Sequence, residues 1–152
     1  MGTLSTITFY EVREDELLPM VRVLQVYDGY IGGVGHELAE WLLNKRIVNG
    51  IKDYSDRKSA NGYGDLVAQY IRDHKPIIGD LYIDTFEDSL YDVEYNYEVY
   101  FENKYPLNPQ EHSLDEMITI EVRNLGMDEL IFHGSPSELL KFSDDDEEDD
   151  DE

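Results

Sequence analysis

Alternation of apolar and polar side chains is clearest over residues 92–102, which read DVEYNYEVYFE. Every second residue from Val93 to Phe101 is apolar or aromatic, and acidic residues hold most of the positions between them. A strand that is buried on one side shows this period of two. The pattern therefore predicts a half-buried antiparallel strand with an acidic exposed side.

Five other segments have the β-branched and aromatic composition that is typical of strands. They span residues 3–12, 20–27, 80–85, 117–122 and 129–133. The polar link over 13–19 predicts that the first two strands form a hairpin. Apolar side chains on both faces of 20–27 predict a central place for that strand in the sheet.

Apolar residues recur at i, i+4 spacing in two further segments, which predicts two helices. The first covers about 35–44, and the second runs from the turn 61–64 to Lys75-Pro76. A capping box, Ser135-Pro136-Ser137-Glu138, predicts a short third helix over 136–142.

The predicted order of elements is β-β-α-α-β-β-β-β-α, in which strands occur in runs. This order predicts an α+β fold, with a mostly antiparallel sheet and two or three helices packed on one face. We expect a single domain over residues 1–142. Residues 143–152 are predicted to form a disordered acidic tail, because they have no apolar side chains to bury.

The charge of the chain indicates which classes of partner its surface attracts or repels. The chain has 35 acidic and 12 basic residues, a net charge of −23, and residues 1–143 alone still carry −14. Such a surface repels nucleic acid and anionic membranes and attracts basic proteins. We therefore expect no direct nucleic acid or membrane partner. The alternative is that the charge serves solubility alone.

Several classes of chemistry have no signal in the sequence. The absence of cysteine excludes disulfides, thiolate catalysis and cysteine-based zinc sites. Neither H-E-x-x-H nor G-x-S-x-G occurs, so we assign no catalytic residue and expect no metal and no cofactor. No apolar run approaches the roughly 18–20 residues of a membrane span. We expect a cytoplasmic protein.

Two glycine-rich turns, each leading into a helix, are the strongest local signals for a ligand site. If the two turns meet, polar and aromatic side chains converge on one pocket, namely those of Asp28, Tyr30, His36, Asn61, Tyr63 and Asp65. The candidate ligand-binding residues are Asp28, Gly29, Tyr30, Gly32, Gly33, Gly35, His36, Asn61, Gly62, Tyr63 and Gly64. The glycine spacing matches neither the phosphate-loop motif nor the dinucleotide motif, and tight packing is the alternative explanation.

The same turns carry a resemblance to a known family. The matching residues are Met1-Gly2-Thr3, Asp28-Gly29-Tyr30 with Gly33-x-Gly35-x-Glu37-Leu38, Asn61-Gly62-x-Gly64-x-Leu66-x-Ala68-Gln69, and Glu94-Tyr95-Asn96-Tyr97. In their order and spacing they resemble a family of small uncharacterised proteins found largely in bacteriophages. The likeness covers about residues 1–102. The chain departs from the family at Leu4, where arginine is common, at Ile31, where proline is usual, and in its acidic tail. The resemblance implies a viral source and a shape, and no reaction.

Acidic residues of the later strands are the candidate partner-binding residues. They are Asp84, Glu87, Asp88, Asp92, Glu94, Glu98 and Glu102. Carboxylates at alternate strand positions lie roughly 6.6–6.8 Å apart, close to the phosphate spacing along one nucleic-acid strand. The alternative is an ordinary solvated strand face.

Together these signals favour a non-enzymatic acidic binding protein of viral origin, active in host takeover. We expect it to engage a basic host or partner protein, including one whose surface also holds nucleic acid. The alternatives are a small enzyme or ligand-binding protein that uses the two glycine-rich turns, and a structural accessory protein of a virion.

Overall fold

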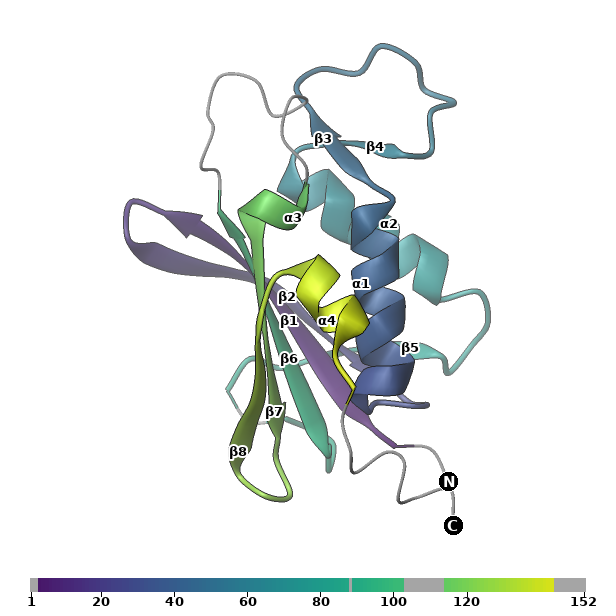
Figure 1. The fold of residues 1–152 in the computed structure, drawn as a ribbon. Helices are drawn as coiled ribbons and strands as arrows, with labels where there is room; N and C mark the ends of the chain where they lie inside the picture. The colour runs from purple at the N-terminus through teal and green to yellow at the C-terminus, as the bar shows by residue number, and fades with distance from the viewer. Residues whose placement is uncertain (1–2, 88, 103–113, 144–152) are drawn as a thin grey trace.

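A six-stranded sheet, with the strand order β5-β2-β1-β6-β7-β8, carries the fold in the computed structural model (Figure 1). The structure describes residues 3–87, 89–102 and 114–143. The strands are β1 (Ser5–Arg13), β2 (Glu16–Gln25), β5 (Leu81–Asp84), β6 (Tyr95–Glu102), β7 (Ile118–Asn124) and β8 (Glu129–Gly134). All six strands predicted from the sequence are present, with shifted ends.

The sheet is mostly antiparallel, and its exception lies at the centre. β6 pairs antiparallel with β7 but parallel with β1. The prediction of a purely antiparallel strand over 92–102 is therefore wrong on the β1 side. The chain leaves the edge strand β5 and passes β2 and β1 before β6 begins, so β6 enters the sheet in the direction of β1.

The β1–β2 hairpin is confirmed, with a tighter turn than the predicted link over 13–19. Glu14 and Asp15 form the turn with φ angles of 47° and 69°. A two-residue turn with positive φ at both positions follows the natural twist of paired strands. β2 is interior only over its last four residues, 22–25, where β5 pairs with it.

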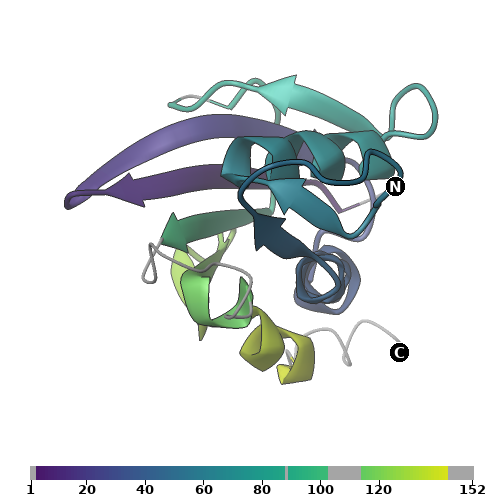
Figure 2. The same ribbon diagram turned by 90° about the horizontal axis from the view of Figure 1, so that it is seen from above.

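The helices gather on one side of the sheet, which curves partly around them in the view from above (Figures 1 and 2). They are α1 (His36–Leu43), α2 (Tyr63–His74), α3 (Leu114–Met117) and α4 (Pro136–Lys141), and a π-helical turn, η1 (Ile31–Gly35), leads into α1. The capping box of α4 is formed as predicted, because Glu138 N donates to Ser135 Oγ and Ser135 N donates to Glu138 Oε1. These elements make one α+β domain.

Two short strands were not predicted. β3 (Arg46–Val48) and β4 (Ser59–Asn61) pair in parallel beside α2, in a part of the chain for which the sequence predicted no strand. Three residues are too few for a period of two to show. The helix α3 was also not predicted, because four residues are too few for a helical period to show. Of the predicted tail, only Ser143 lies within the described residues.

The core lies between the sheet and the helices. Side chains at alternate positions of the central strands point into it, among them Ile7, Tyr97 and Val99, each fully buried. Leu38 of α1 and Tyr70 of α2 meet them from the helical side and are also fully buried. The apolar stripes that predicted the elements are thus the surfaces on which they pack.

We call the sheet face opposite the described helices the outer face. The segment between β5 and β6, residues 85–87 and 89–94, crosses the outer face, and we call it the crossing link. Arg22 lies on that face, where its Nε donates to Thr8 Oγ1 and its Nη1 to the carbonyl of Thr85. Leu24 and Thr6 are only 2% exposed there, since the crossing link covers them.

Candidate functional site

The first glycine-rich turn is filled by the protein's own atoms. A Cβ built on Gly29 would lie 2.8 Å from the Cβ of Ser5, and one built on Gly33 would lie 2.2 Å from the carbonyl oxygen of Asp28. The buried hydroxyl of Tyr97 donates to the carbonyl of Gly29 at 2.7 Å. Close packing against β1 and β6, rather than a ligand, accounts for these glycines.

Polar residues of the same turn are engaged within the fold. The Tyr30 hydroxyl donates to Asp28 Oδ1 at 3.3 Å. His36 Nε2 lies 2.7 Å from the carbonyl oxygen of Phe142, at the end of α4. The imidazole thus ties α1 to the C-terminal helix.

The second turn lies at the other end of the helix pair. Glu37 of α1 contacts His74 at the end of α2, and Trp41 Nε1 donates to Asp73 at 3.0 Å. Lys45, which follows α1, reaches back to Gln69 at 3.3 Å. The helices are therefore antiparallel, so their starts lie apart. The predicted pocket shared by the two glycine-rich turns is not formed.

Residues 61–64 have mixed roles. Gly62 has φ of 91°, which favours glycine, and neither Gly62 nor Gly64 has another atom within 4 Å of a built Cβ. Tyr63 is buried and stacks on Phe101 at 4.6 Å, so it belongs to the core. Asn61 is the residue of this turn that lines a pocket.

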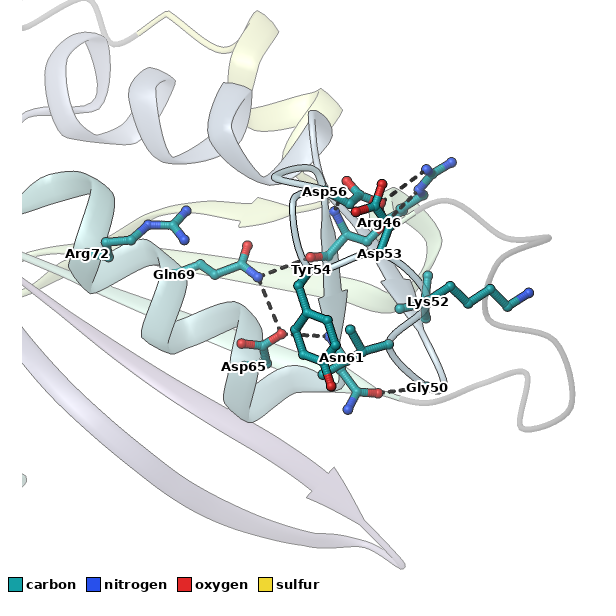
Figure 3. Close-up of a pocket in the computed structure, with 13 residues that line it drawn as sticks. Arg46, Gly50, Lys52, Asp53, Tyr54, Asp56, Asn61, Asp65, Gln69 and Arg72 are labelled. Atoms are coloured by element: carbon teal, nitrogen blue, oxygen red, sulfur yellow. Dashed lines mark hydrogen bonds and ion pairs between the residues drawn. The ribbon is translucent and has the colours of Figure 1, made fainter.

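That pocket, of about 490 Å³, lies between the β3–β4 pair, the loop 49–58 and α2 (Figure 3). Its lining includes Lys52, Tyr54, Asn61, Asp65, Gln69 and Arg72. Apart from Asn61 and Asp65 these residues were not predicted as a site. The signal in the sequence was the basic composition of the loop. Its ten residues include Lys52, Arg57 and Lys58, whereas the chain as a whole is strongly acidic.

The predicted row of carboxylates over 92–102 is shorter than the sequence indicated. β6 begins at Tyr95, so Asp92 and Glu94 lie in the crossing link, ahead of the strand. Glu98 and Glu102 lie on the outer face of β6, four residues apart with Tyr100 between them. Their separation is about 13 Å, twice that of alternate strand positions, so no pair of carboxylates on β6 has the predicted phosphate spacing.

Two other predicted partner-binding residues have different outcomes. Asp84 is 6% exposed and accepts hydrogen bonds from Thr85 N at 2.8 Å, Leu90 N at 2.9 Å and Ser89 Oγ at 2.6 Å. It anchors the crossing link and does not face solvent. Glu87 is exposed on that link, and Asp88 lies outside the described residues.

No protein family model, curated protein or solved structure matches the chain. The arrangement of its own side chains must therefore carry the functional argument.

Tyrosines and glutamates form a cluster on the outer face. Tyr10 and Tyr100 stack with ring centroids 5.0 Å apart. The Tyr100 hydroxyl donates to Glu98 Oε1 at 2.8 Å, and the Tyr10 hydroxyl donates to Glu98 Oε2 at 3.1 Å. Burial first, and then the Glu98 carboxylate, raise the pKa of Tyr100 far above its ordinary value of 10. The same two causes also raise the pKa of Tyr10.

Replacing Glu98 by glutamine is expected to lower the pKa of Tyr100 part of the way towards 10, since burial remains when the charge is removed. The carbon-13 shift of the Tyr100 ring, followed against pH, measures this. In the wild type the raised pKa gives stability that is present in full below pH 10 and is lost as pH rises above 10. Glu102→Gln, on the same strand, should leave the Tyr100 titration unchanged. An unchanged titration in Glu98→Gln would contradict the assignment.

Within residues 3–87, 89–102 and 114–143, no group of three or more His, Asp or Glu side chains is arranged to hold a metal ion. No helix in that part of the chain is both long enough and apolar enough to span a membrane.

Proposed function

We propose that the protein is a non-enzymatic binding protein that engages a basic surface of a partner protein through the outer face of its sheet. The observation that carries the proposal is the grouping of exposed carboxylates on one side. Glu87, Asp92 and Glu94 of the crossing link share that side with Glu102 of β6, and the half-buried Glu98 lies between the link and Glu102 on the same face.

Charge elsewhere supports the same partner chemistry. Outside residues 45–75 the chain has 31 acidic residues and 5 basic ones. A field of this sign accelerates encounter with a cationic protein and repels nucleic acid. The stacked Tyr10 and Tyr100 add aromatic contact area, which is the kind of surface that anchors protein interfaces. A basic partner therefore fits better than an anionic one.

The resemblance to bacteriophage-type proteins suggests where the partner would be found. The partner would be a basic protein of the host cell, reached in the cytoplasm. Because the carboxylates do not form a long, evenly spaced row, recognition would depend on overall charge and ring contacts and not on a copy of the phosphate spacing. A host protein that also holds nucleic acid remains within this class.

The test uses the full chain and a fluorescent ten-residue lysine peptide, with binding followed by anisotropy. Raising the salt from about 0.05 M to 0.5 M is expected to weaken binding more than tenfold, since screening then limits charge interactions to a few ångström. Removing two charges with Asp92→Asn and Glu94→Gln should weaken low-salt binding about three- to fivefold.

A matched control removes two exposed carboxylates elsewhere, with Glu16→Gln in the hairpin and Glu40→Gln on α1. It should weaken binding less than twofold, and a chain that ends at residue 143 separates the contribution of the acidic tail. Equal losses in both double variants, or binding that does not respond to salt, would refute the outer face as the binding surface.

A further inference from the structure

One segment of this acidic protein carries the opposite charge. Residues 45–75 contain seven Lys or Arg side chains and four Asp, a net of +3 within a chain of −23. The pocket beside α2 is lined entirely from this segment, and its charged residues are Arg46, Lys52 and Arg72 on the basic side and Asp53, Asp56 and Asp65 on the acidic side. The lining itself is therefore balanced in charge, so an anionic group on a ligand would be held by individual cations and not by a net positive field.

The loop 49–58 that walls the pocket is held in one shape. It joins the parallel strands β3 and β4 without a helix. Asp53 Oδ1 accepts from the backbone and hydroxyl of Ser55, and Asp56 accepts from Lys58 N at 2.8 Å and from Ser59 Oγ at 2.7 Å. These hydrogen bonds occupy both carboxylates and lower the pKa of Asp56 to about 2. A loop that is ordered in advance loses less entropy when a ligand binds.

Arg72 projects from α2 at one end of the pocket (Figure 3). Arg72 donates from Nε to Asp73 at 2.8 Å, and its terminal nitrogens have no partner among the described residues. Lys45 lies outside the lining; its Nζ is 3.8 Å from Asp73 Oδ2, on the carboxylate that Arg72 also contacts, and donates to the carbonyl of Arg57 at 2.7 Å. Burial first, and then repulsion by Arg72 and Arg57 against the attraction of Asp73, lower the pKa of Lys45.

The middle of the pocket is aromatic and polar. Tyr54 is 88% exposed, and it lines the pocket together with Asn61 and Asp65 (Figure 3). Asp65 Oδ2 accepts from Asn61 N at 2.8 Å and from Gln69 at 3.3 Å, while Asn61 Oδ1 accepts from Gly50 N at 2.9 Å. Asp65 Oδ1 and the Asn61 amide NH₂ thus remain as an acceptor and a donor in the pocket that the Tyr54 ring also lines.

From this arrangement we propose that the pocket binds a small phosphorylated ligand with a planar ring, of the nucleoside 5′-monophosphate class. The phosphate lies at the Arg72 end, the base stacks on Tyr54, and the sugar or base edge bonds to Asp65 and Asn61. A guanidinium with free terminal nitrogens suits a phosphate, and every base presents a stacking face. The volume of about 490 Å³ falls within the usual range for small-ligand sites. This site is on the helical side and does not depend on the proposed partner face.

Calorimetric titration of the full chain tests the proposal with the four ribonucleoside 5′-monophosphates, the four nucleosides and ribose 5-phosphate. At least one monophosphate is expected to bind with a Kd on the order of 100 μM. The matching nucleoside and ribose 5-phosphate should each bind at least about tenfold more weakly, because each lacks one of the two anchors. Equal binding of either fragment would overturn the ligand class.

Two variants and two controls locate the site. Tyr54→Ala and Arg72→Gln should each weaken binding of the monophosphate about tenfold. Tyr27→Ala and Arg13→Gln, which change an exposed tyrosine and an exposed arginine away from the pocket, should leave it unchanged. Thermal unfolding confirms that all four proteins fold. No heat of binding with any monophosphate at about 5 mM, or binding that Tyr54→Ala and Arg72→Gln both leave intact, would overturn the proposal.

Discussion

Replacing Gly33 by alanine is expected to lower the free energy of unfolding by about 3 kcal/mol or more. The added Cβ would lie 2.2 Å from the carbonyl oxygen of Asp28 and 2.6 Å from its Cβ. That carbonyl accepts a hydrogen bond from Val34 N at 2.7 Å, so it cannot move away without breaking the turn. Urea unfolding followed by circular dichroism measures the change.

Gly64→Ala is the matched control for that variant. Gly64 lies in the first turn of α2, and no other atom lies within 4 Å of a Cβ built there. Alanine is the better helix former, so this variant should gain about 0.5–1 kcal/mol. Similar losses of unfolding free energy in both variants would show that packing does not constrain the glycine-rich turn at Gly33 as the structure indicates.

Asp84→Ala is expected to cost about 3 kcal/mol, because the backbone N–H groups of Thr85 and Leu90 lose a buried acceptor together. Burial alone would raise the pKa of Asp84, but the hydrogen bonds from Leu90, Ser89 and Thr85 together lower it. Its contribution to stability is thus present above the unfolded-state pKa and is lost as pH falls below it.

Asp84→Asn is the control, because its side-chain oxygen still accepts from both N–H groups. The loss should be less than half of that in Asp84→Ala. Hydrogen exchange at Leu90 adds a local measurement, and its protection should fall in the alanine variant before the core opens. Unchanged exchange at Leu90 in Asp84→Ala would contradict the anchoring role.

Much of the fold was predictable because burial imposes a period on the sequence. Tyr97, Val99 and Phe101 alternate with polar neighbours, and all three are buried. The cap at Ser135 was predictable because its two hydrogen bonds join residues only three positions apart. Signals of this kind are local, so they can be read from the sequence without knowledge of the tertiary structure.

Other features depend on contacts that are distant in the chain. The parallel register of β6 on β1 follows from the path of the crossing link, which no local pattern specifies. The two glycine-rich turns look alike in the sequence, yet Gly29 and Gly33 avoid clashes while Gly62 supplies a positive φ. The pocket combines Tyr54 of a loop with Arg72 of a helix, and their proximity depends on how β3 and β4 pair.

The place of β1 between β2 and β6 has a consequence for how the chain folds during synthesis. Thr6 bonds to Asn96 across 90 residues, so β1 leaves the ribosome well before β6 and waits for it before its second edge is paired. Contacts of such long sequence separation slow folding. Until then the nascent hairpin shows an open edge, which is the kind of surface that chaperones shield from aggregation.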